Sequence, residues 1–130
     1  RLMSKIYDNL DDIIDYENVY TDDAKIVIVT FGSTARSTLQ AIKVLRQEGL
    51  KVGMLRLKTI WPFASKAILE LVNTSVKHLI VAEMNYGQLI QEVKATAEGA
   101  FKVDGLNKYS GELITPWEII DKVKEVAKDA

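Results

Sequence analysis

Apolar residues along this chain gather into short runs separated by polar segments. The runs at 25–31, 52–57 and 78–83 are nearly continuous, the first of them is rich in β-branched residues, and a weaker run covers 100–106. A nearly continuous apolar run is typical of a strand that is covered on both faces, as in parallel sheets. A half-exposed strand instead alternates apolar and polar residues. The pattern therefore predicts three buried strands, a weaker fourth strand, and a short edge strand at 17–20.

Between these runs, apolar residues recur at the three- and four-residue spacing of an amphipathic helix. This spacing predicts helices over about 34–48, 62–72, 88–98 and 116–127, and a helical segment over 1–15. Gly49 and Gly99 are suited to end two of them. The last helix has the clearest start, because Thr115-Pro116-Trp117-Glu118 has the layout of a capping box with proline in the first helical position.

Strands and helices alternate through short connections. This order predicts an α/β fold, a three-layer α/β/α sandwich around a mostly parallel sheet. We expect residues 1–15 to form an N-terminal helical segment and residues 16–130 to form one α/β domain, because no repeat or linker divides them.

Composition excludes several kinds of site. The 130-residue chain contains no cysteine, which excludes disulfides, thiolate metal sites, a cysteine nucleophile and iron–sulfur ligation by this chain. Its formal net charge of −1 gives no general attraction for nucleic acid or an anionic membrane. No apolar run reaches the length of a membrane span, and there is no signal-peptide pattern. We expect a cytoplasmic domain without nucleic-acid or membrane partners. The first residue is Arg1 rather than methionine, so we also expect a fragment or a processed chain.

Two loops are candidates for ligand contact, because open α/β sheets bind ligands at the carboxyl ends of strands where the strand order reverses. The first contains Gly32, Ser33 and Thr34, whose hydroxyls and backbone N–H groups at a helix start suit an anion. One glycine does not make a dinucleotide or phosphate loop, however. Ser33 or Thr34 is more simply a helix cap, so we favour that interpretation.

The second loop contains Glu83, Asn85, Gly87 and Gln88, which offer one carboxylate and two amides. A structural turn or an inter-domain contact is favoured over catalysis, since structural networks also recruit such groups. His78, the only histidine, has no triad or zinc-site partners nearby and is interpreted as structural. We therefore expect no catalytic residue, no cofactor and no metal ligand in this chain, with both loops as weak candidates for a ligand or inter-domain contact.

Three ordered segments carry a family resemblance, namely 24–35, 55–63 and the glutamate–asparagine–glycine–glutamine turn within 81–89. Together they resemble the carboxyl-terminal domain, core domain II, of 2-oxoacid:ferredoxin oxidoreductase alpha subunits, a domain that is transketolase C-terminal-like. The resemblance covers about 16–126. One departure is Ala64, where relatives often carry a second proline.

The resemblance implies an antiparallel edge strand beside 52–57, followed in space by 26–31, 79–83 and 101–106. It also implies the reaction of the parent enzyme, the oxidative decarboxylation of a 2-oxoacid to acyl-CoA with reduction of ferredoxin. That enzyme uses thiamine diphosphate, magnesium, an iron–sulfur cluster and coenzyme A. The family holds thiamine diphosphate between two other domains, so this domain is expected to contribute assembly and architecture.

The implied partners are the N-terminal domain of the same alpha subunit, other subunits of the enzyme, and ferredoxin through the complex. Two alternatives remain: an autonomous small-anion-binding module, and the equivalent domain of a thiamine-dependent 2-oxoacid dehydrogenase.

Overall fold

The computed structural model describes residues 16–32, 34–58, 64–72, 74–83, 88–108 and 112–128. The helical segment expected over 1–15 lies outside these ranges, so that segment and the domain boundary at residue 16 stay predictions. Ser33, Asn85 and Gly87 also lie outside them, as does the side chain of Gln88.

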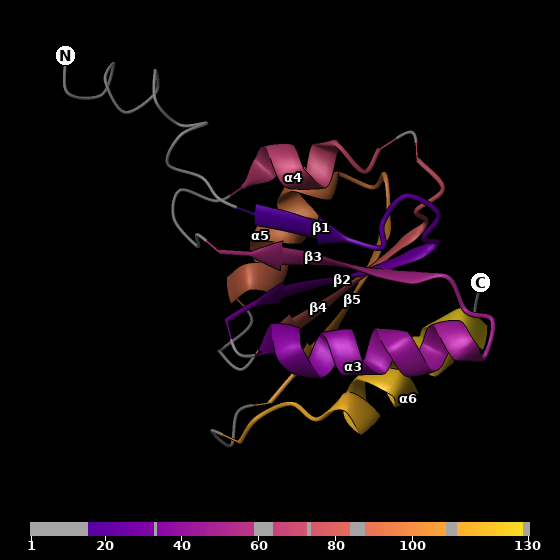
Figure 1. Cartoon of the computed structure of the whole chain (residues 1–130). Coiled ribbons are helices and arrows are strands. Elements are labelled where there is room, and N and C mark those ends of the chain that lie inside the picture. Colours follow the sequence, from indigo (N-terminus) through magenta and orange to yellow (C-terminus); the bar gives the residue numbers. More distant parts are fainter. Residues whose placement is uncertain are drawn as a thin grey trace, which may run out of the picture.

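The described strands form one five-stranded sheet in the order β1-β3-β2-β4-β5 (Figure 1). Their bounds are β1 Tyr16–Val19, β2 Ile26–Phe31, β3 Val52–Leu57, β4 His78–Glu83 and β5 Lys102–Asn107. β1 runs antiparallel to β3, and the other neighbouring pairs are parallel. This confirms the predicted fold class, and it also confirms the strand order and antiparallel edge strand that the resemblance implied.

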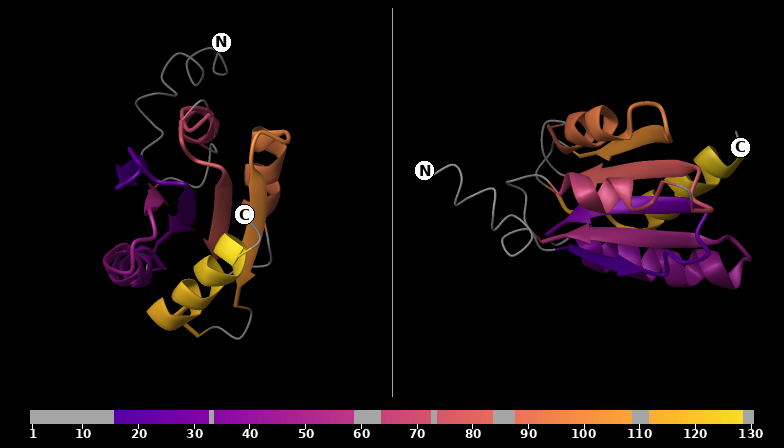
Figure 2. Two further views of the ribbon diagram at one scale, coloured as in Figure 1. Left: turned by 90° about the vertical axis from the view of Figure 1, so that its right-hand side faces the viewer. Right: turned by 90° about the horizontal axis from the view of Figure 1, so that it is seen from above.

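Four helices cover the two faces of this sheet (Figure 2). They are α3 Thr34–Gln47, α4 Ser65–Leu69, α5 Gln88–Ala97 and α6 Pro116–Lys128. α3 and α6 pack on one face, and α4 and α5 pack on the other. The predicted three-layer α/β/α sandwich is therefore confirmed.

The central strand β2 shows why the apolar runs are continuous. Val27 and Val29 belong to the core under α4 and α5, whereas Ile26 and Ile28 belong to the core under α3 and α6. All four side chains are buried, with exposed fractions of at most 6%. Burying each such side chain stabilises the fold by about 1.5–3 kcal/mol, which explains why these four consecutive positions are apolar.

The second predicted helix is shorter than its apolar stripe. The described α-helix spans only Ser65–Leu69, because the residue before it, Ala64, has φ −81° and ψ 63° and is not helical. Beyond it, the N–H groups of Leu71 and Val72 donate to carbonyls three residues earlier, at 3.1 Å each, as in a tighter 3₁₀-type turn. The apolar stripe of this segment is still largely buried. The prediction of which side faces the core was therefore correct, and the predicted length of the α-helix was wrong.

Candidate functional site

The candidate site lies at the carboxyl ends of β2 and β4, which are neighbours in the sheet. The chain leaves β2 into α3 and leaves β4 towards α5. These helices cover opposite faces of the sheet, so the strand order reverses between the two strands. Thr30 pairs in register with Ala82 at this end. The structure thus brings Gly32 and Glu83, one residue from each predicted loop, to the same end of the sheet.

Glu83 is buried, with 6% of its surface exposed. Its carboxylate accepts the backbone N–H of Ile90 at 2.9 Å and that of Leu89 at 3.4 Å. Both donors belong to the first turn of α5, where N–H groups have no partner within the helix and the helix dipole favours a negative charge. The described contacts therefore support a structural role for Glu83, that of closing the start of α5 onto the end of β4.

The Gly32 turn is a tight junction between β2 and α3. Gly32 has φ +72°, a left-handed conformation that favours glycine, and its carbonyl accepts the N–H of Ala35 at 3.2 Å. Thr34 is 3% exposed, and its carbonyl accepts the hydroxyl of Thr38 at 2.9 Å. These contacts fit the interpretation as a helix start. The buried hydroxyl of Thr30 has no hydrogen-bond partner in the part of the chain that the structure describes.

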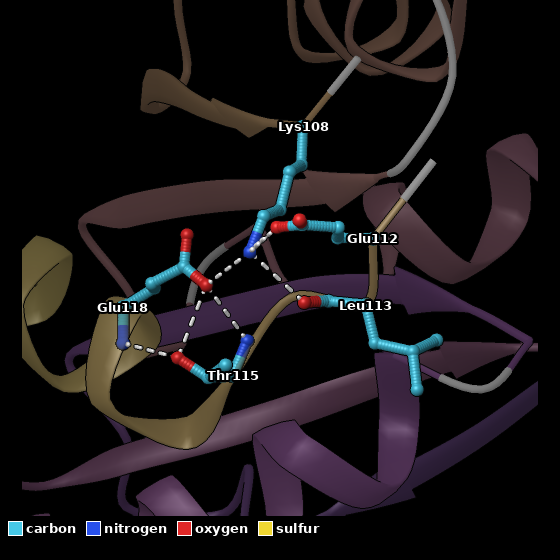
Figure 3. Close-up of polar contacts among 5 residues, drawn as sticks. All are labelled: Lys108, Glu112, Leu113, Thr115 and Glu118. Carbon is cyan, nitrogen blue, oxygen red and sulfur yellow. Dashed lines mark hydrogen bonds and ion pairs between the residues drawn. The ribbon is translucent and has the colours of Figure 1, made fainter. Parts of the chain in front are cut away.

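The start of α6 is held by a compact polar network (Figure 3). The N–H of Thr115 donates to Glu118 Oε1 at 3.1 Å, and the N–H of Glu118 donates to Thr115 Oγ1 at 3.2 Å, which is the predicted capping box. Lys108 Nζ adds a 2.8 Å ion pair to Glu118 and donates to the carbonyl of Leu113 at 3.1 Å. The network fastens the end of β5 to the start of α6.

Lys108 and Glu118 each favour the ionised form of the other. The hydrogen bond from Lys108 holds the pKa of Glu118 below its usual value, and the N–H of Thr115 acts in the same direction. The same contact raises the pKa of Lys108, with Glu112 as a further carboxylate at 3.6 Å. Sequence reasoning found the capping box but missed Lys108, which is ten residues away from Glu118 and is brought to it only by the fold.

Two large apolar side chains flank this network and are exposed. Leu113 is 60% exposed and Trp117 is 71% exposed. Leu113 immediately precedes Ile114, which is 1% exposed. The buried side chain of Ile114 therefore anchors the segment, while that of Leu113 lies on the surface. The polar contacts of Lys108 and Glu118 hold the backbone that carries both exposed residues.

The family resemblance implied magnesium and an iron–sulfur cluster, whose ligands are side chains of known types. The chain has no cysteine to serve as a thiolate ligand for an iron–sulfur cluster. Within the described ranges, no group of three or more His, Asp or Glu side chains could hold a metal ion. The residues that the structure describes therefore do not fit magnesium, and the sequence supplies no thiolate for a cluster.

Comparison with known proteins decides the family. Residues 24–119 match the family described as pyruvate:ferredoxin oxidoreductase core domain II. The chain belongs to this family. Within core domain II, the match covers β2 through the start of α6 and so includes both candidate loops.

A curated relative of this core domain II is 2-oxoglutarate synthase subunit KorA from Methanothermobacter marburgensis. The two are 40% identical over 123 residues, which is 95% of this chain and 32% of the relative. The chain thus spans about a third of the length of the curated relative that it matches.

Solved structures agree with this assignment. The 2-oxoglutarate:ferredoxin oxidoreductase from Magnetococcus marinus, with 2-oxoglutarate, coenzyme A and succinyl-CoA bound, superposes with a TM-score of 0.74 and 31% identity. The match covers 91% of this core domain II and 21% of that chain. A transketolase from Pichia stipitis shares the fold, with a TM-score of 0.62 at 20% identity over 87% of this chain and 18% of its own. The transketolase-like fold and the family resemblance are therefore confirmed. In the described part of the chain, no helix is both long and apolar enough to cross a membrane.

Proposed function

We propose that this chain is core domain II of the alpha subunit of a 2-oxoacid:ferredoxin oxidoreductase. The whole enzyme would oxidatively decarboxylate a 2-oxoacid to acyl-CoA and reduce ferredoxin. Thiamine diphosphate, magnesium, the iron–sulfur cluster and coenzyme A would be bound mainly by other parts of the enzyme. Membership of the core domain II family is the observation that carries this proposal. The alternative of a 2-oxoacid dehydrogenase domain has less support, because the matching family is ferredoxin-linked.

Within that enzyme, the domain would contribute assembly and architecture rather than catalytic groups. Glu83, the buried carboxylate of the candidate site, is already engaged by two N–H groups of α5. A catalytic carboxylate has to exchange a proton or contact substrate, and both are opposed by these bonds. Gly32, Ser33, Thr34, Asn85, Gly87 and Gln88 would then serve as contacts to a neighbouring domain or to a ligand held by it.

The exposed pair Leu113 and Trp117 is the best-supported contact surface for the rest of the enzyme. Large aromatic side chains that stand out from a surface are frequent anchors of protein interfaces. The surrounding backbone is fixed by Lys108 and the capping box, so little ordering is needed on docking. We expect this surface to pack on the N-terminal domain of the same alpha subunit or on a neighbouring subunit.

Assembly of the enzyme with a doubly substituted alpha subunit tests this role. Leu113→Ala together with Trp117→Ala should weaken subunit assembly in analytical ultracentrifugation, while turnover per assembled complex stays near that of the unsubstituted enzyme. Leu69→Ala is the matched control, because Leu69 is 54% exposed but lies on α4, which covers the other face of the sheet. Lost turnover in complexes that assemble normally would contradict the architectural role.

The isolated chain gives a second test. Calorimetric titration should detect no binding of thiamine diphosphate, and the chain should show no oxidoreductase activity. Saturable micromolar binding of coenzyme A or a nucleotide at the Gly32 and Glu83 edge would instead favour the autonomous anion-binding module.

A further inference from the structure

A row of lysines lines the edge of the sheet opposite to the candidate site. Each parallel strand begins at or directly after a lysine, in the spatial order Lys51, Lys25, Lys77 and Lys102. Their backbones are linked directly. The N–H of Lys25 donates to the carbonyl of Lys51 at 2.9 Å, that of Lys77 to Lys25 at 2.8 Å, and that of Lys102 to Lys77 at 3.2 Å. Lys51, Lys25 and Lys77 each precede a residue of one in-register set, Val52, Ile26 and His78, so with strands about 4.8 Å apart their side chains start along a line of roughly 10 Å. Lys102 is offset from this line by one residue, because it pairs in register with His78.

This row borders a cavity of about 300 Å³. Lys25, Lys51 and Lys77 line it together with His78, and Leu50 and Val52 contribute apolar surface. The lysines are exposed, whereas His78 is 5% exposed. The cavity therefore combines exposed lysines with an apolar wall, which is the composition of a site for a small organic anion.

The lysines of this row are not neutralised by close ion pairs in the part of the chain that the structure describes. Within the described ranges, none of the four lysines forms an ion pair or a side-chain hydrogen bond with a carboxylate. Asp23 pairs with Arg46 at 2.8 Å, and Glu48 pairs with Lys124 at 3.0 Å. Lys51 interacts with Asp23 only through longer-range attraction, which helps to lower the pKa of Asp23. Like charges on adjacent strands repel, so the row would be stabilised by a bound anion with several charges.

The ends of the helices offer a simpler account of the lysines. α3 and α6 end at this edge of the sheet (Figure 1), and cations near a helix C-terminus are favourable. That account explains the sign of the charges, but it does not require a cavity between them. It predicts that removing a lysine lowers stability and changes no binding.

We propose that this cavity binds a phosphate-bearing anion. The phosphate oxygens would contact Lys25, Lys51 and Lys77, and an organic group attached to them would lie against Leu50 and Val52. Several negative charges are needed, because one phosphate meets only part of a row set by strand spacing. The site is distinct from the Gly32 and Glu83 loops, which lie at the other edge of the sheet.

The single histidine of the chain makes the site directly observable. Proton NMR of the His78 ring should show a saturable shift when ADP or inorganic diphosphate is added at constant pH and ionic strength, and no shift with adenosine. Comparison of ADP with diphosphate separates two kinds of ligand. If the natural ligand is organic, ADP should bind more tightly than diphosphate, because its organic group contacts the apolar wall. If the ligand is inorganic, the two should bind equally well.

Charge-removing variants locate the contacts. Lys51→Gln and Lys25→Gln should each raise the dissociation constant for ADP about fivefold, equivalent to ~1 kcal/mol per exposed charge-assisted contact. Lys58→Gln is the matched control. Lys58 is exposed and directly follows β3, whereas Lys51 directly precedes it, so the two lysines lie at opposite ends of one strand. Lys58→Gln should leave binding unchanged. All variants are first compared with the unsubstituted chain by thermal melting.

Three results would overturn the proposal. The His78 resonance could stay unmoved by both phosphates, or Lys58→Gln could weaken binding as much as Lys51→Gln, which would indicate diffuse charge attraction. The third result is that Lys25→Gln melts at a lower temperature while ADP leaves the melting temperature of the unsubstituted chain unchanged. The lysines would then only stabilise the helix ends. None of these bears on the architectural role of the domain, which is tested by subunit assembly.

Discussion

Replacing Glu83 by glutamine tests whether the buried carboxylate of the candidate site is structural. The glutamine side chain keeps one oxygen, which can still accept the N–H of Ile90, now 2.9 Å from the carboxylate. Its NH₂ group then faces the N–H of Leu89, so that two donors oppose each other where the carboxylate accepted a hydrogen bond.

The expected loss of stability follows from these two contacts. Hydrogen bonds to a charged group contribute about 1.5–3 kcal/mol, and a negative charge at a helix N-terminus about 0.3–1 kcal/mol. Glutamine avoids the cost of burying a charge, and it retains one acceptor. We therefore expect the free energy of unfolding to fall by about 2 kcal/mol rather than by the sum of these values.

Urea unfolding followed by circular dichroism measures this change. The midpoint should fall by about 1 M, given the usual denaturant dependence for a domain of this size. Glu92→Gln is the control, because Glu92 is an exposed carboxylate of the same helix, and its effect should stay within about 0.5 kcal/mol. Equal midpoints for the two variants would refute the capping role, and lost turnover in fully assembled enzyme would point to catalysis instead.

Three further predictions concern packing, capping and pH. Gly105→Ala would place a Cβ 2.7 Å from Ile90 Cδ1, so it should cost about 1–2 kcal/mol in urea unfolding, and less when combined with Ile90→Val in a double-mutant cycle. Thr115→Ala removes the cap of α6 and should lower the free energy of unfolding by about 1 kcal/mol, measured in the same way. Arg46 lowers the pKa of Asp23 through its hydrogen bond. The stabilisation from this pair should therefore be complete above the ordinary aspartate pKa and be lost as the pH falls through the lowered pKa. In Arg46→Gln, NMR titration should show the Asp23 pKa returning towards its usual value.

The sequence was sufficient to predict those elements of the fold for which a local pattern corresponds to a single structure. Nearly continuous apolar runs predicted β2, β3 and β4, because a strand buried on both faces needs apolar residues at most of its positions. The start of α6 was predicted to the residue, since the two hydrogen bonds between Thr115 and Glu118 depend on sequence spacing alone.

The same reasoning was insufficient where an outcome depends on the paths of distant segments. The apolar stripe around Ile68 could not show that α4 passes into a 3₁₀-type turn, because both helices keep residues three apart on one side. The lysines before the strands were visible in the sequence, yet they form a row only when the strand order is known. The role of Glu83 stayed open for a similar reason, since its partners depend on where α5 begins relative to β4.

The antiparallel direction of β1 determines where the preceding polypeptide joins the domain. Tyr16 pairs with Leu57, the last residue of β3, so the chain enters β1 at the same edge as Gly32 and Glu83. A partner domain attached through this point would be tethered at the strand ends that carry Gly32 and Glu83, with an effective concentration that reaches millimolar for short linkers. Under that condition, an interface too weak to hold two separate molecules together can remain closed almost all the time. Modest affinity of these strand ends for a free partner would therefore be compatible with a rigid subunit.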